Sequence, residues 1–120
     1  MKAIVLTLAL VLAVGSAAVL ARPDSQTLKG YLMDVSCQKK HAGEADFAAG
    51  HDKDCLQMCA KNGFGVITDE GKFIRFDSAG NKKVEQFLKD TDRDTGWKIE
   101  VTGQVKGQTM TVESISLSRP

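Results

Sequence analysis

The sequence predicts a mainly β protein: a small five-stranded OB-like barrel with a cysteine-containing helical insertion after its first strand and a short helix between its third and fourth strands. Three observations lead to this fold class. Five short segments have the apolar patterning of strands, a helically spaced segment separates the third from the fourth, and a polar region with all the cysteines follows the first. In OB-folds the first inter-strand loop is a usual binding loop, and the insertion would occupy that loop.

A first strand and a helical insertion are expected over residues 28–63. Residues 28–35 read LKGYLMDV, whose side chains alternate between two faces, and we expect a strand there. Residues 36–63 contain all three cysteines and both histidines at helical rather than strand spacing. They end at Asn62-Gly63, a pair that favours a helix C-terminus. This region is therefore expected to be a helical insertion.

A hairpin and a helix are expected next. The apolar runs at residues 64–68 and 72–76 are separated by Asp-Glu-Gly, a loop length and composition typical of a β-hairpin. After a polar turn, apolar residues recur at helical spacing over residues 82–90. The segment predicts one short helix between the third and fourth strands.

Two further strands complete the predicted barrel. Residues 97–105 alternate apolar and polar side chains more regularly than any other segment, beginning with Trp97, which we expect in the core. A turn through Gly107 leads to residues 109–117, where the apolar alternation changes phase. This change predicts a β-bulge near Glu113 or Ser114.

The N-terminus predicts export. Lys2 is followed by an apolar run and then by small residues up to Ala21, the pattern of a cleaved secretory signal peptide over residues 1–21. We expect residues 22–27 to be a disordered leader and residues 28–120 to form a single OB-like domain, since 99 residues suffice for one modest core. The expected location is periplasmic or extracellular, without stable membrane insertion after cleavage.

Charge argues against two classes of partner. Of the 16 basic residues, only Lys2 lies in the predicted signal peptide, so the remaining chain has as many basic as acidic residues. Binding to nucleic acid or to an anionic membrane needs a basic face, so we expect neither partner. The expected partner is a metal ion or an unidentified protein, and the expected state is a monomer or a thiol-linked dimer.

Cys37, His51, Cys55 and Cys59 are the candidate metal ligands. Three thiols and one imidazole form the ligand set of a tetrahedral structural zinc site, and they also suit cuprous copper. In one continuous helix residues 51 and 59 would lie about 12 Å apart along the axis, too far to share an ion. A common site therefore requires His51 to precede the helix, with Asp52 as a plausible cap.

A disulfide is the competing interpretation. Because three cysteines are an odd number, Cys37 could be bonded to Cys55 or Cys59, leaving a spare thiol in a structural or interaction module. Thiol redox activity is a weaker alternative, which needs an exposed cysteine of low pKa. The chain has neither the C-x-x-C motif of thioredoxin-like proteins nor the C-x-x-C-H motif of haem attachment. We expect no enzymatic activity and no catalytic residues.

Three segments resemble a family of small exported bacterial domains of unknown function. They are GYLMDVSC at residues 30–37, HDKDCLQMCAKNG at 51–63 and VTGQVKGQTMTVESI at 101–115. The resemblance picks out six positions and omits His41: Asp34, Cys37, His51, Cys55, Cys59 and Gly63. Gln38 departs from the family, in which glycine is expected after the first cysteine.

The resemblance supports a metal site that includes His51 rather than His41. The family implies no activity, so the predicted function follows from ligand chemistry: an exported, non-enzymatic module whose Cys37, His51, Cys55 and Cys59 bind zinc or cuprous copper. For Asp34 a plain turn residue is the favoured interpretation, and a cap for the insertion or a group that orients one of the ligands is the alternative.

Overall fold

A five-stranded mixed sheet closes into a ring in the computed structural model, which describes residues 24–119. The predicted signal peptide and residues 22–23 of the predicted leader lie outside the described residues. The strands follow the ring order β1-β2-β3-β5-β4. Their bounds are β1 Ser25–Asp34, β2 Phe64–Thr68, β3 Phe73–Phe76, β4 Lys98–Lys106 and β5 Thr109–Leu117.

The long strand β1 closes the ring. Its first part pairs with β4 and its second part with β2, both antiparallel, and Gly30 and Tyr31 pair on both sides. The remaining contacts are antiparallel except for the short parallel pairing of β3 with β5. The predicted mainly β architecture of five strands is confirmed, as are the positions of both helical segments.

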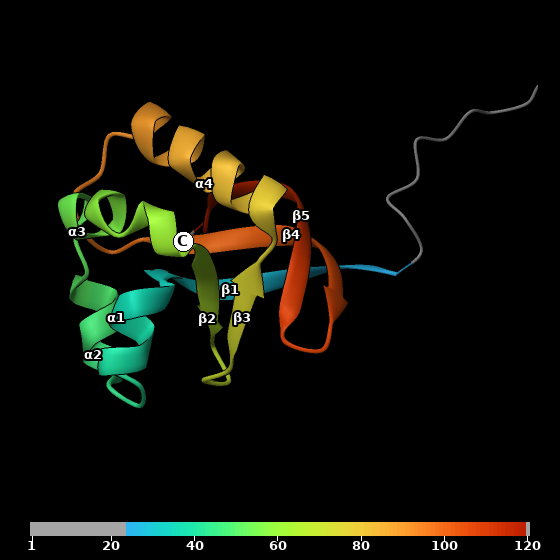
Figure 1. The fold of residues 1–120 in the computed structure, drawn as a ribbon, viewed down its shortest axis with the longest axis horizontal. Coiled ribbons are helices and arrows are strands. Elements are labelled where there is room, and N and C mark those ends of the chain that lie inside the picture. The colour runs from blue at the N-terminus through green and yellow to red at the C-terminus, as the bar shows by residue number, and fades with distance from the viewer. Residues whose placement is uncertain (1–23, 120) are drawn as a thin grey trace, which may run out of the picture.

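The interior of the ring is apolar and is closed on one side by a helix. Trp97 is completely buried, as predicted, and its ring meets Phe87 of helix α4 (Ser78–Asp90) edge to face, with centroids 5.9 Å apart. Val84 and Leu88 of α4 are also fully buried. Figure 1 shows α4 lying along the sheet. The core within the ring includes Leu32, Val66, Ile99, Val101 and Met110.

Helix α4 begins four residues before its predicted start, because Asp77 caps it. The Asp77 side chain accepts a hydrogen bond from the Gly80 backbone N–H at 2.8 Å. Gly80 lets this first turn approach β5, since a Cβ there would lie 2.7 Å from a methyl group of Val112. The polar residues before 82, read as a turn in the sequence, are therefore helical.

The insertion consists of several short helices gathered at the end of the sheet where β1 finishes (Figure 1). They are α1 (Val35–Lys40), α2 (Ala45–Gly50), α3 (Lys53–Met58) and the 3-10 turn η1 (Ala60–Asn62). Two backbone hydrogen bonds fasten the insertion to the loop before β4, from Lys53 N–H to the Asp94 carbonyl at 2.8 Å and from Gly96 N–H to the Ala49 carbonyl at 3.1 Å. The helices are thus held against the body of the domain.

The start of β1 differs from the prediction by three residues, whereas the predicted bulge in β5 is present. β1 begins at Ser25, which pairs with Gln104, so residues 25–27 belong to the sheet and not to a disordered leader. In β5, Val112 faces Gly103 and Ser114 faces Thr102, which leaves Glu113 as the extra residue of the predicted bulge. Among the described residues, no helix has the length and hydrophobicity required to cross a membrane.

Candidate metal centre

Asp34 is the centre of a buried polar group at the junction of β1 and α1. It is the last residue of β1 and the N-cap of α1, where its Oδ2 accepts a hydrogen bond from the Cys37 backbone N–H at 2.8 Å. Capping explains why the strand ends at Asp34 rather than at Val35, the predicted last residue. The carboxylate is completely buried, so its charge requires partners within the protein.

His51 supplies the second partner of this carboxylate. It follows α2 and precedes α3, and its Nε2 lies 2.7 Å from Asp34 Oδ1. The Phe47 ring of α2 packs against the imidazole with centroids 5.1 Å apart. As the sequence predicted, His51 lies before the helix and Asp52 caps it, accepting from the Cys55 backbone N–H at 2.7 Å.

These contacts determine the ionisation of Asp34. Burial by itself would raise the pKa of Asp34, but the hydrogen bonds from His51 and from the Cys37 N–H outweigh burial. The net pKa lies below the ordinary value of 3.8. Asp34 is therefore a carboxylate at neutral pH, the form that binds a metal or orients an imidazole.

Cys37 completes a cluster of three potential ligands. A carboxylate oxygen of Asp34, the Cys37 sulfur and an imidazole nitrogen of His51 all lie within 4.8 Å of one another. Two of these residues are buried and Cys37 is partly exposed, so the cluster has one side open toward solvent. The structure thus brings together two of the four predicted ligands, Cys37 and His51, and adds Asp34.

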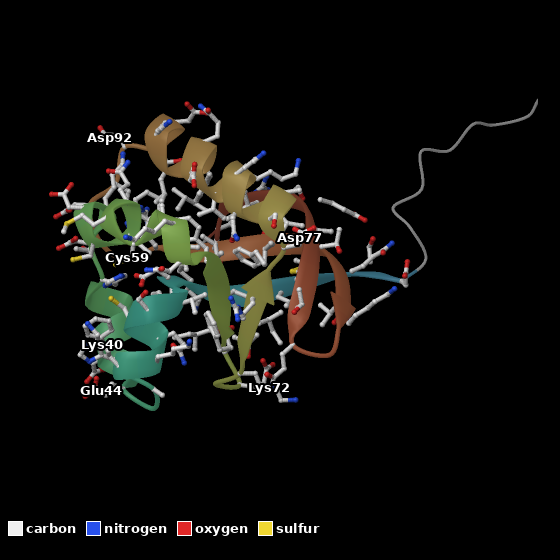
Figure 2. The ribbon with its side chains drawn as sticks, viewed as in Figure 1. Lys40, Glu44, Cys59, Lys72, Asp77 and Asp92 are labelled. Atoms are coloured by element: carbon white, nitrogen blue, oxygen red, sulfur yellow. The ribbon has the colours of Figure 1, made fainter. Side chains whose placement is uncertain are left out.

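Cys55 and Cys59 lie outside that cluster. Cys55 is exposed on α3, and Cys59 is half-buried at the C-terminal end of the same helix, between α3 and α1 (Figure 2). Both influence Cys37 electrostatically, Cys59 more than Cys55. Cys59 is therefore the better placed of the two to approach the cluster.

The predicted disulfide is absent. Cys37, Cys55 and Cys59 are all free thiols, so the alternative of a bond from Cys37 to Cys55 or Cys59 is wrong for this structure. The reason is local: Cys37 lies in the first turn of α1 beside Asp34, whereas Cys55 is on the exposed face of α3.

Cys37 and Cys55 do not have the lowered pKa that thiol redox chemistry uses. Burial, together with the negative charge of Asp34, raises the pKa of Cys37 from 9.0 to about 12. The pKa of Cys55 is also raised, first because its thiol donates a hydrogen bond to Asp52. A reactive cysteine has a lowered pKa, so neither side chain matches that type of thiol.

His41 belongs to a separate surface pair. Its Nδ1 contacts Glu44, and its ring stacks on Phe47 with centroids 3.7 Å apart. Through Phe47 it supports the packing around His51 without joining the cluster of ligand atoms. This arrangement agrees with the choice of His51 over His41 made from the sequence.

Comparison with known proteins does not assign this site. No family model matches the chain, and neither the curated proteins nor the solved structures yield a match. The chemical reading of the site therefore rests on its own geometry. The sequence favoured a plain turn residue at Asp34, with a cap or an orienting group as the alternative. The D-x-x-C spacing, which places its carboxylate beside the Cys37 backbone N–H, was the signal for its larger role.

Proposed function

We propose that the chain is an exported, non-enzymatic module that binds a zinc ion through Asp34, Cys37 and His51. The observation that carries the proposal is the presence of three different ligand atoms within 4.8 Å of one another in a largely buried setting. Zinc bonds to these atoms are about 2.0 to 2.3 Å long, so small side-chain movements suffice for all three to share one ion.

The donor set favours zinc over cuprous copper at this position. One carboxylate, one thiolate and one imidazole form a mixed oxygen, sulfur and nitrogen set, which suits a borderline divalent ion, whereas cuprous copper prefers sulfur. Three protein ligands leave a fourth coordination position, which an external ligand such as water can take. Compared with the expected set of Cys37, His51, Cys55 and Cys59, the proposed set keeps Cys37 and His51 and has Asp34 in place of the other two cysteines.

Metal binding would relieve an unfavourable feature of the cluster. The Cys37 thiol retains its proton because burial, and after it the negative charge of the Asp34 carboxylate, raises the pKa of this thiol. A divalent cation reverses that balance, since it attracts both negative groups and displaces the thiol proton. Without metal, the Asp34 carboxylate orients the imidazole of His51.

The location and fold class form part of the same proposal. The apolar N-terminal segment supports export, and the resemblance to small exported domains agrees with it. The ring order of the strands, with one helix between β3 and β4, supports an OB-like barrel whose first loop has been enlarged into the metal-binding insertion.

Metal analysis of the purified protein tests the function. Protein prepared without chelator should contain about one equivalent of zinc, and Cys37→Ser and His51→Asn should each lose most of it. The matched control is His41→Asn, which changes the other histidine and should retain the ion. Less than about a tenth of an equivalent in the parent protein, even after incubation with zinc, would contradict the proposal. The buried Asp34–His51 contact would then be a structural link alone.

A further inference from the structure

The exposed residues of α3 include two sulfur-containing side chains, Cys55 and Met58, beside the polar Asp54 and Gln57. Met58 is 79% exposed, and among residues 24–119 no other large hydrophobic side chain is exposed. Cys55, three residues earlier, is exposed as well, whereas Leu56 on the opposite side of the helix is completely buried. Helix α3 thus packs on the core through Leu56, and core packing does not explain the presence of Cys55 or Met58.

Helical geometry makes Cys55, Met58 and Cys59 neighbouring positions. Positions three and four apart on a helix are neighbours, with Cβ atoms about 5 to 6 Å apart. Met58 is three residues after Cys55, and Cys59 is four residues after it, joined by the helical hydrogen bond from Cys59 N–H to the Cys55 carbonyl at 3.2 Å. The methionine side chain has three rotatable bonds and can swing toward the thiol.

We propose that Cys55 and Met58, with Cys59 as a third ligand, form a surface site for cuprous copper. Thiolate and thioether sulfurs are soft ligands that select this ion, and they match zinc less well. The site is made of residues other than the three in the buried cluster, so it does not depend on zinc binding there. The two metals suggested by the sequence would then bind at two neighbouring sites.

Binding at this site requires no change of oxidation state. Cu⁺ replaces the protons of the Cys55 and Cys59 thiols, which are both released to solvent, and the Met58 thioether donates a lone pair without losing a proton. The Asp52 carboxylate, which accepts hydrogen bonds at the start of α3 from the Cys55 backbone N–H and thiol, places a negative charge beside the incoming cation. An accessible site of this kind allows the ion to enter and leave.

Cuprous copper added under anaerobic, reducing conditions provides the test. Its affinity is measured by competition with a coloured chelator specific for Cu(I), while the Met58 methyl resonance is followed by NMR in methyl-labelled protein. The parent protein should bind the ion with a marked shift of the Met58 methyl signal. Met58→Leu and Cys55→Ser should each weaken binding by about tenfold or more, the scale typical of losing a contact at a metal site.

Controls separate this site from the buried one. Gln57→Leu alters an exposed neighbour on α3 without removing sulfur, and it should leave the Cu(I) affinity unchanged. Zinc content should be the same in Met58→Leu as in the parent, whereas Cys37→Ser should lose zinc but retain the Cu(I)-induced shift of Met58. An unmoved Met58 signal, or unchanged Cu(I) affinity in Met58→Leu, would overturn the surface site whatever the zinc result.

Discussion

The Nε2 atom of His51 lies 2.7 Å from the Oδ1 atom of Asp34, and both side chains are almost completely buried. The contact joins the end of β1 to the link between α2 and α3, 17 residues further along the chain. Asp34 also caps α1, so the same carboxylate stabilises the first helix of the insertion and binds His51 in the middle of the insertion. The same contact that positions the candidate ligands therefore also stabilises the fold around them.

Removal of His51 should destabilise the protein strongly. His51→Ala leaves the Asp34 carboxylate buried without its side-chain partner, and breaking a buried pair in this way costs about 3 to 5 kcal/mol. Urea denaturation of the metal-free protein measures the loss. The double variant Asp34→Asn/His51→Ala should lose less than the sum of the two single variants, because the unpaired charge is gone.

Glu44→Gln is the matched control for that experiment. It removes the charge from the other histidine–carboxylate pair, His41 with Glu44, whose side chains are 36% and 59% exposed. An exposed pair contributes less than about 1 kcal/mol. Equal losses from His51→Ala and Glu44→Gln would contradict the central role of the buried contact.

Lowering the pH should decrease the free energy of unfolding, because Asp34 becomes protonated. The native pKa of Asp34 is lower than 3.8, so the unfolded chain takes up this proton first as the pH falls. The contribution of Asp34 to the unfolding free energy is therefore present above pH 3.8 and is lost as the pH falls through the lower native pKa. In urea titrations from about pH 5 to about pH 2, the stability gap between the parent protein and Asp34→Asn should narrow. A gap that stays constant would refute this assignment.

Cys37 should react slowly with alkylating reagents. Raising its pKa from 9.0 to about 12 lowers the thiolate fraction at pH 8 by roughly a thousandfold. Cys55 is exposed and should be modified first, although its own pKa is also raised. Iodoacetamide treatment followed by mass spectrometry of the digested protein gives the order of reaction. Modification of Cys37 as fast as Cys55 in the folded protein would show that burial and the Asp34 carboxylate do not suppress ionisation of the Cys37 thiol.

Much of the fold could be predicted from local sequence patterns. The alternation of apolar and polar residues from Trp97 onward predicted the strand β4, and the change of phase near Glu113 predicted the bulge in β5. Both patterns depend only on residues that are close together in the sequence. The helix α4 was predicted too short because its first turn depends on the Asp77 cap and on close packing of Gly80 rather than on apolar periodicity. The start of β1 at Ser25 depends on pairing with Gln104, a partner far away in the sequence.

The types of ligand in the candidate site could be predicted from the sequence, whereas the residues that form the site could be predicted only in part. The position of His51 before a helix capped by Asp52 follows from helix geometry, and the structure has it. Which thiols face His51 depends on how three short helices pack against the end of the ring, and spacing along the chain does not determine this packing. Spacing therefore grouped Cys55 with Cys37, whereas packing places Asp34 beside Cys37 and leaves Cys55 exposed.

Closure of the ring should depend on Gly30. At this residue β1 pairs with β2 on one side, through Thr68, and with β4 on the other, through Ile99. A Cβ at position 30 would lie 1.8 Å from the Ile67 carbonyl oxygen, a backbone atom that cannot move without disturbing β2. Gly30→Ala should therefore lower the unfolding free energy by about 2 kcal/mol or more, at the upper end of the usual cost of overpacking.

Gly50→Ala supplies the comparison, since a Cβ at that position meets no atom within 4 Å. Gly50 is the last residue of α2, where alanine favours the helix by up to about 1 kcal/mol, so this variant should be neutral or slightly stabilised. Urea midpoints of the two variants measure the contrast, and far-ultraviolet circular dichroism confirms that both remain folded. If Gly30→Ala unfolded at the same urea concentration as Gly50→Ala, β1 would not be held between two strands at residue 30, and the sheet could not close there.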